Sequence, residues 1–144
     1  MRCVIERVSQ AKVSVDGKII GSIEKGFLVY VGLHHLDDEK IITKMAQKVL
    51  SLRIFEDDTQ KMNLNLSQVN GQILSISQFT LYGDAKGNNR PSFIEAARPE
   101  FALKLYDLFN SKLSKSCEVQ KGLFGTHMEI SATNDGPVTI IIEM

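Results

Sequence analysis

The sequence predicts a mixed α/β protein with a curved, largely antiparallel, barrel-like β-sheet and two main helices. Short segments rich in β-branched residues recur along the chain, and two segments carry apolar residues at helical spacing. Strands and helices do not alternate as regularly as in a doubly wound fold. The chain has 144 residues, 43% of them hydrophobic, which is enough to bury one core. We therefore expect a single domain over residues 1–144.

The first part of the chain predicts strands followed by a helix. The segments with strand character are 2–8, 12–15, 18–20 and 26–33. Asp16-Gly17 is typical of a hairpin turn, and residues 26–33 are apolar on both faces, as in a central strand. Asp37 is the expected N-cap of a helix over about 38–52. The apolar stripe of that helix is Ile41, Met45, Val49 and Leu52.

The second part predicts a strand, a helix and a closing pair of strands. Residues 53–70 are expected to be irregular, 72–81 to form a strand, 82–91 a loop and 92–97 a short turn. Pro99 fits the first position of a helix, because proline is tolerated there. The apolar face of this helix is Phe101, Leu105, Leu108 and Phe109. Strands are expected over about 126–133 and 138–143.

Composition narrows the classes of protein. Lys+Arg and Asp+Glu both number 17, so the formal net charge is zero, which does not favour a protein that wraps long stretches of nucleic acid. The two cysteines, Cys3 and Cys117, fit small apolar residues in a reducing compartment. The first residues lack an apolar signal segment, and the longest apolar stretch, Gly26–Leu33, is far short of the ~20 residues of a membrane span. We expect a cytoplasmic protein with no membrane partner.

The sequence also lacks the common catalytic signatures. It contains no H-E-x-x-H or C-x-x-C, no G-x-S-x-G elbow, no Walker loop and no G-x-G-x-x-G. We therefore expect no metal and no cofactor. The neighbouring His34 and His35 are interpreted as surface or rim residues, and no role is assigned to His127.

The segment Ser77-Gln78-Phe79-Thr80-Leu81 lies at the end of a predicted strand. On composition alone it is an ordinary strand with alternating polar side chains. The functional alternative is that a strand ending at a loop leaves backbone N–H groups unpaired. Such groups stabilise a developing oxyanion.

The segment Asn134-Asp135-Gly136-Pro137-Val138-Thr139 is typical of a hairpin turn. The alternative is a cis bond between Gly136 and Pro137, which the local sequence leaves open because only about 5–6% of X-Pro bonds in folded proteins are cis. A cis bond would turn the carbonyls of both residues toward one side and make a rigid pair of acceptors.

Together these two segments resemble the signature motifs of the D-aminoacyl-tRNA deacylases. The resemblance extends over essentially the whole chain: MRCVIERVSQAKVSVDG at the start, RIFEDDTQKMNLNL at 53–66, RPSF at 90–93 and GLFGTHM at 122–128. It implies hydrolysis of the ester between a D-amino acid and the 3′-terminal adenosine of tRNA, without cofactor or metal. It also implies a homodimer in which Gly136-Pro137 of one subunit enters the pocket of the other.

The resemblance further implies a mechanism of selection. Main-chain carbonyls hold the substrate ammonium group, so that the side chain of an L-amino acid clashes with Gly136-Pro137 while that of a D-amino acid points outward. Glycine has no side chain to clash, so mischarged glycyl-tRNA(Ala) is an expected second substrate.

The roles implied for the remaining residues are as follows. Ser77, Gln78, Phe79 and Thr80 form the catalytic segment, with two mechanisms open. In one, Thr80 attacks the ester. In the favoured one, backbone N–H groups of Phe79 and Thr80 hold the oxyanion while the terminal 2′-hydroxyl assists water, because Thr80 has no evident base. The supporting residues are Arg7, Asn134 and Thr139, with a solvated strand position as the alternative for Arg7.

Phe124 and Met128 are candidates for an adenine wall, with a place in the core as the alternative. The residues considered for a basic rim are Lys86, Arg90, Lys112, Lys115 and Lys121. A general esterase for small molecules and a non-catalytic nucleic-acid-binding dimer remain as alternative functions.

Overall fold

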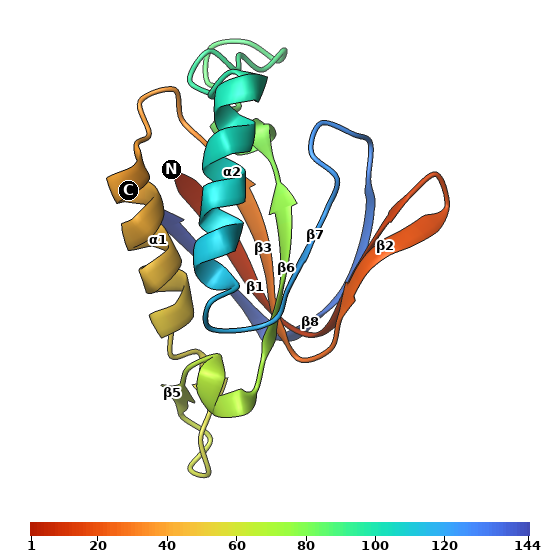
Figure 1. Ribbon diagram of the computed structural model, residues 1–144, viewed down its shortest axis with the longest axis vertical. Coiled ribbons are helices and arrows are strands. Elements are labelled where there is room, and N and C mark those ends of the chain that lie inside the picture. The colour runs from red at the N-terminus through yellow and green to blue at the C-terminus, as the bar shows by residue number, and fades with distance from the viewer.

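A computed structural model describes residues 1–144 and shows a curved sheet covered on one face by two helices (Figure 1). The elements of the main sheet are β1 (Arg2–Val15), β2 (Lys18–Ile23), β3 (Gly26–Gly32), β6 (Gln72–Ser77), β7 (Val119–Lys121) and β8 (Glu129–Glu143). The helices are α1 (Glu39–Ser51) and α2 (Pro99–Leu113), with short 3₁₀ turns at Ser67–Val69 and Phe79–Tyr82. Strands β4 (Phe55–Glu56) and β5 (Met62–Leu64) form a separate small hairpin. The expected fold class is confirmed.

The sheet is mixed, and β1 organises it. β8 lies along one edge of β1 for almost its whole length. On the other edge, the first half of β1 pairs with β3 and the second half with β2, all antiparallel. Strands β3, β6 and β7 then run parallel to one another. The expected strands 2–8 and 12–15 are therefore one continuous strand, because β8 pairs with the chain across the gap between them.

Alternation along the strands divides the core in two. Side chains such as Ile5, Phe27 and Ile73 face the helices in the larger cluster. Side chains such as Val13, Leu28 and Leu74 face the opposite way, into a smaller cluster inside the curl of the sheet. A strand that buries both faces must be apolar throughout, as residues 26–33 are.

Each helix begins with a residue that suits a helix N-terminus. Asp38 caps α1, its side chain accepting from the backbone N–H of Ile41 at 2.9 Å. The expectation that Asp37 is the cap is wrong, because Asp37 is buried in an ion pair with the amino nitrogen of Met1. Pro99 stands at the first position of α2 as expected. No helix is both long enough and apolar enough to cross a membrane.

Helix α2 buries most of the expected apolar face: Leu105 and Phe109 are buried, Leu108 is partly buried against the same core, and Phe101 is the exception. Its buried residues are Ala102, Leu105, Tyr106, Phe109, Asn110 and Leu113. Phe101, which was expected on the apolar face, is 41% exposed.

Three features of the strands also differ from the expectation. The strand expected over 72–81 ends at Ser77, and residues 79–82 turn into a 3₁₀ helix. The hairpin expected around residues 134–137 is absent, and β8 runs through this segment as one strand. The short strand β7 was not expected from the sequence.

Gly26 provides a test of the parallel pairing between β3 and β6. A Cβ at this position would lie 1.9 Å from the carbonyl oxygen of Gln72, its partner in the neighbouring strand. We expect Gly26→Ala to lower the free energy of unfolding by about 4 kcal/mol or more, because backbone and not a flexible side chain must move. Urea unfolding measures this, with Gly87→Ala as the control, since nothing lies within 4 Å of its Cβ position. Equal stability of both variants would contradict the pairing.

Candidate active site

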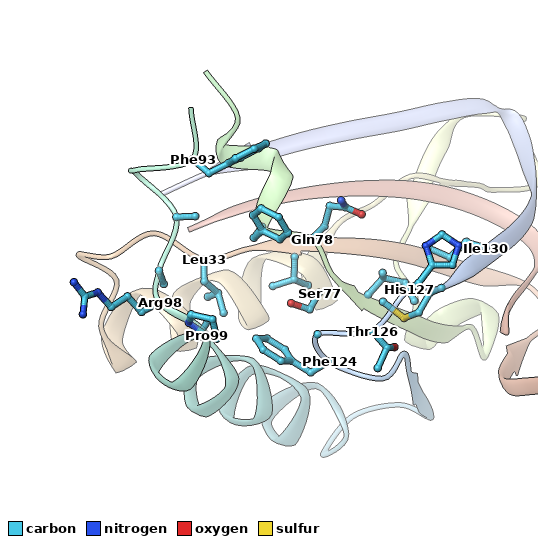
Figure 2. A pocket seen from close by; sticks show the side chains of 18 residues that line it. Leu33, Ser77, Gln78, Phe93, Arg98, Pro99, Phe124, Thr126, His127 and Ile130 are labelled. Carbon is cyan, nitrogen blue, oxygen red and sulfur yellow. The ribbon is translucent and has the colours of Figure 1, made fainter. Parts of the chain in front are cut away.

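The main pocket lies at the carboxyl ends of the parallel strands β3 and β6, next to the start of α2. It is a cavity of about 630 Å³ with 18 lining residues, 11 of them hydrophobic, within the usual size range of small-molecule sites. Figure 2 shows Ser77 and Gln78 near its middle, Arg98 at one end and His127 at the other. The structure therefore brings Ser77, Gln78 and Phe79 to one cavity.

The segment from Ser77 to Thr80 leaves main-chain donors free. The backbone N–H of Gln78 donates to the carbonyl of Val31 at 2.8 Å, which is the last bond between this segment and β3. The chain then turns into the 3₁₀ helix Phe79–Tyr82. The first residues of a helix lack internal partners for their N–H groups, and those of Phe79 and Thr80 donate to no acceptor.

The hydroxyl of Thr80 has one side-chain partner, the amide of Gln78, which donates to it. Thr80 is exposed and is not among the residues that line the pocket. The side chains of Ser77 and Gln78 do line it.

Aromatic rings cover the pocket. Phe79 and Phe93 meet edge to face, with their ring centroids 5.1 Å apart. Phe124 and Met128 are half-buried, line the cavity and also pack against the two hydrophobic clusters. Phe124 and Met128 therefore belong both to the pocket and to the core, two positions that the sequence analysis offers as alternatives. Phe93 belongs to the quoted segment RPSF, but its contact with Phe79 could not be read from spacing.

The strand beneath Ser77 is held by Tyr106 of α2. Its buried hydroxyl donates to the carbonyl of Ser75 at 2.8 Å, and burial raises the pKa of this phenol. Phe124 lies against the same ring, with 6.0 Å between centroids. The floor of the pocket is therefore tied to α2 on the helix side of the sheet.

The second sequence segment forms a bulge in β8. Between the paired residues Val8–Asn134 and Glu6–Thr139, residues 135–138 face Arg7 alone. The Gly136-Pro137 peptide bond is cis. Both residues are exposed, whereas Val138 is buried in the larger cluster. Gly136 and Pro137 thus face outward, and the buried side chain of Val138 anchors the bulge in the core.

Side chains of Arg7 and Asn134 hold this bulge. Arg7 is 4% exposed, so a solvated position for it is wrong. Its Nε donates to the carbonyl of Asp135 at 2.9 Å, and its Nη1 donates to the carbonyl of Ile54 at 2.7 Å. Asn134 accepts from the backbone N–H of Val138 at 2.8 Å and donates to the Thr139 hydroxyl at 3.1 Å.

Within one chain, the bulge and the pocket are apart. Arg7, opposite the bulge, pairs with Phe27 on β3, whereas Ser77 pairs with Val31. Four residues along a strand span about 13 Å. Neither Gly136 nor Pro137 lines the pocket.

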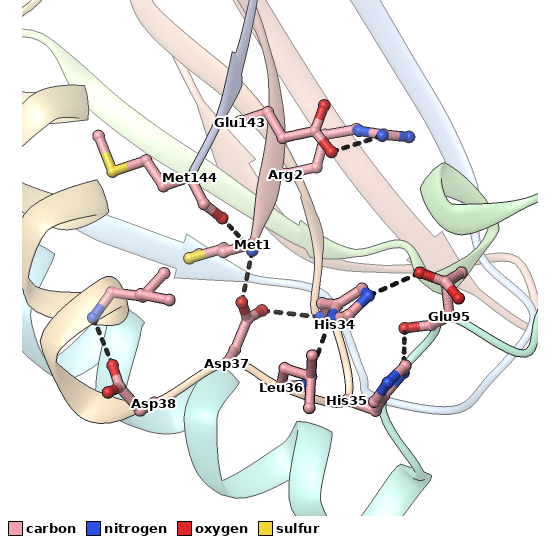
Figure 3. A network of polar contacts seen from close by, with 11 residues as sticks. Met1, Arg2, His34, His35, Leu36, Asp37, Asp38, Glu95, Glu143 and Met144 are labelled. Carbon is pink, nitrogen blue, oxygen red and sulfur yellow. Dashed lines mark hydrogen bonds and ion pairs between the residues drawn. The ribbon is translucent and has the colours of Figure 1, made fainter.

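A polar network that the sequence analysis did not predict joins the N-terminus to His34 and Glu95 (Figure 3). Asp37 accepts from the Met1 amino nitrogen at 2.5 Å and from the backbone N–H of His34 at 2.7 Å. His34 Nδ1 accepts from the backbone N–H of Leu36, so Nε2 carries the proton and donates to Glu95 at 2.8 Å. Glu95 directly precedes Ala96 and Ala97, which line the pocket.

The structure contains no group of three or more His, Cys, Asp or Glu side chains placed to hold a metal ion. The fold and pocket define a small α/β protein whose candidate site offers main-chain donors and aromatic walls around a cavity.

Comparisons with known proteins identify the family. The sequence model of the family described as D-Tyr-tRNA(Tyr) deacylase matches residues 4–143. A D-aminoacyl-tRNA deacylase of Kosmotoga olearia is 51% identical over 99% of this chain and 97% of its own. One of Bacillus cereus is 50% identical over 99% of both chains. The chain belongs to the D-Tyr-tRNA(Tyr) deacylase family.

Solved structures agree on the fold. The structure of a protein named c-Myc DNA Unwinding Element Binding Protein superposes with a TM-score of 0.94 at 37% identity, covering 100% of this chain and 99% of its own. A probable eukaryotic D-amino acid tRNA deacylase superposes with a TM-score of 0.83 at 17% identity, covering 99% and 98%. At that identity the second likeness concerns the fold alone.

The His34–Glu95 contact predicts a titration. The hydrogen bond from His34 lowers the pKa of the Glu95 carboxyl. We expect His34→Phe, which keeps a ring beside Tyr82, to raise this pKa toward its ordinary value in an NMR pH titration. Because the folded pKa is the lower one, the contribution of this contact is present above the ordinary Glu pKa and is lost as the pH falls through the folded pKa. An unchanged Glu95 titration in His34→Phe would contradict the contact.

Proposed function

We propose that this protein hydrolyses the ester between a D-amino acid and the 3′-terminal adenosine of tRNA, which keeps D-residues out of protein. The single observation that carries the proposal is the pocket at the ends of β3 and β6. There, two unpartnered backbone N–H groups stand beside a cavity with aromatic walls. An aminoacyl ester is already reactive, so orientation and oxyanion donors are the help that it needs. Membership of the family and relatives of about half-identical sequence support the same reaction.

We propose further that the working unit is a homodimer. Gly136 and Pro137 are exposed on a braced bulge, yet they lie apart from the pocket of their own chain. A twofold axis could place the bulge of each subunit at the pocket of the other. In a twofold interface, any contact from one subunit to its partner occurs a second time in the opposite direction. The rigid seat provided by Arg7 and Asn134 supports this role, since a selective contact must be held in one position.

Selection against L-amino acids would then be steric. The carbonyls of Gly136 and Pro137 would accept from the substrate ammonium group, and the ester carbonyl would be fixed by Phe79 and Thr80. With both ends held, the side chain of an L-amino acid would point at the bulge. This selection ignores the nature of a D-side chain, and glycyl-tRNA(Ala) would also be cleaved because glycine has nothing to clash.

For the chemical step, we favour attack by a water molecule assisted by the terminal 2′-hydroxyl of the tRNA. The Thr80 hydroxyl accepts from the Gln78 amide and has no other side-chain partner. A hydroxyl nucleophile needs an adjacent base, and an amide N–H is not one. Gln78 would help to place the ribose, while Phe124 and Met128 would flank the adenine.

An assay that compares matched D- and L-aminoacyl-tRNA substrates tests the proposed function. We expect catalytic amounts of the protein to hydrolyse D-aminoacyl-tRNA rapidly and matched L-aminoacyl-tRNA hardly at all. Equal loss of both esters would indicate a general esterase. Binding of tRNA or DNA without turnover would indicate a nucleic-acid-binding protein, in line with the name of one protein of similar structure.

Gly136 provides a test of selection. A Cβ there would lie 2.7 Å from a side-chain carbon of Val138 and 3.1 Å from the Arg7 guanidinium. We expect Gly136→Ala to displace the bulge and to lower the ratio of D- to L-aminoacyl-tRNA hydrolysis by about tenfold or more. Thr133→Ala, an exposed change on the same strand, is the matched control. A Gly136→Ala protein that folds and keeps the parental ratio would refute this role.

Thr80 separates the two mechanisms. We expect Thr80→Ala to keep kcat within about threefold, because its backbone N–H remains. Replacing the terminal 2′-hydroxyl of the tRNA by hydrogen should lower kcat by about 10²-fold or more. Single-turnover assays of both changes, which measure the chemical step itself, distinguish the two mechanisms. A drop of about 10⁴-fold in Thr80→Ala, with the 2′-deoxy substrate still cleaved, would instead establish Thr80 as the nucleophile.

A further inference from the structure

Arg98 is the one lining residue of the main pocket with a permanent charge. The other polar lining side chains are Ser77, Gln78, Thr126 and His127. Arg98 directly precedes α2, and Figure 2 shows it at the end of the pocket opposite His127. A single permanent charge at one end of the cavity favours a ligand with one negative group at that end.

The guanidinium of Arg98 has no protein partner. It takes part in none of the ion pairs or side-chain hydrogen bonds of the structure, and the residue is exposed. The acids closest in sequence do not neutralise it. Glu95 is bonded to His34, and Glu100 is exposed in the first turn of α2. Lys121, by contrast, already pairs with Asp107 at 3.3 Å.

The proposed substrate has one charged group at the corresponding place. A terminal adenosine carries its ester at the 3′ position, its base at the 1′ position and a phosphodiester at the 5′ position. If the ester lies at Phe79 and the base between Phe124 and Met128, the 5′ side is left to face the remaining end of the pocket. Arginine matches phosphate oxygens with two parallel N–H donors.

We propose that Arg98 binds the phosphate that joins the terminal adenosine of tRNA to the preceding nucleotide. This inference rests on the proposed function and adds to it the part of the polynucleotide that the protein grips. It assigns Arg98 a binding role and no part in the chemical step. It also fits a chain of zero net charge, because a protein that grips only the terminal nucleotide needs few phosphate contacts.

The test compares two small substrates: the 3′-D-alanyl esters of adenosine and of adenosine 5′-methylphosphate, which carries the diester charge. For the wild-type protein, the phosphate should raise kcat/KM about tenfold, chiefly through a lower KM. Arg98→Gln should lose at least fivefold more on the phosphate-bearing ester than on the other. Arg98→Lys should restore part of the difference, because the charge remains while the paired donors do not.

Lys104→Gln is the matched control, since it removes an exposed charge from α2 outside the pocket and should show no phosphate-dependent loss. A parallel series with D-alanyl-tRNA measures salt dependence. Arg98→Gln should flatten the slope of log kcat/KM against log salt by about 0.7, the value for one phosphate contact on a single strand.

The outcomes separate the two proposals. Equal losses on both small esters, or no loss on either, overturn the assignment of Arg98 while leaving the deacylase function intact. If neither small ester is cleaved, the salt slope on D-alanyl-tRNA decides, and an unchanged slope overturns the assignment. If the wild-type protein cleaves none of the three substrates, the proposed function itself fails.

Discussion

The hydrogen bonds of the buried Arg7 guanidinium fix the part of the structure on which the proposed selection depends most. This guanidinium lies beneath the bulge of β8 and donates to two main-chain carbonyls, of Asp135 and Ile54, that are far apart in the sequence. A buried charge is costly unless its donors are satisfied, so these carbonyls and the nearby carboxylates of Glu56 and Asp135 hold the arginine as firmly as it holds them. The bulge is thereby fixed to both β1 and the segment after α1.

The fixed position of the bulge matters because the candidate site has no acid–base pair of side chains. In the proposed reaction, the pocket would offer backbone donors at Phe79 and Thr80 and room for a nucleoside, and the bulge of the partner subunit would offer backbone acceptors. Main-chain groups do not distinguish one side chain from another, which suits the proposed cleavage of esters that carry many different D-side chains. Their positions then have to be set by packing and by hydrogen bonds such as those of Tyr106 and Asn134. In the proposed complex, the fixed charge of Arg98 would contact the substrate's phosphate and not its reacting carbon.

Much of the fold could be predicted from local patterns, and the errors have physical causes. Pro99 marked the start of α2 correctly, because proline fits that position in any context. Asn134-Asp135-Gly136-Pro137 has the composition of a turn, yet the strand continues because β1 pairs with β8 on both sides of it. Asp37 and Asp38 are equivalent as caps in sequence, and only the buried partner of Asp37 separates them. The place of Arg98 in the pocket and the contact between His34 and Glu95 both depend on residues distant along the chain. The spacing of residues in the sequence could therefore not predict them.

The central claim is that each site is completed by the bulge of the other subunit, and mixed dimers test it most directly. One linked subunit carries Gly136→Ala with a normal pocket. The other carries Phe79→Pro, which removes a proposed oxyanion donor at a helix position that tolerates proline, with a normal bulge. Contribution across the interface predicts one intact site per dimer, and therefore about half of the wild-type rate on D-aminoacyl-tRNA with full selectivity. If each bulge instead served its own chain, neither site would be intact, and the absence of selective hydrolysis in a folded mixed dimer would contradict the account.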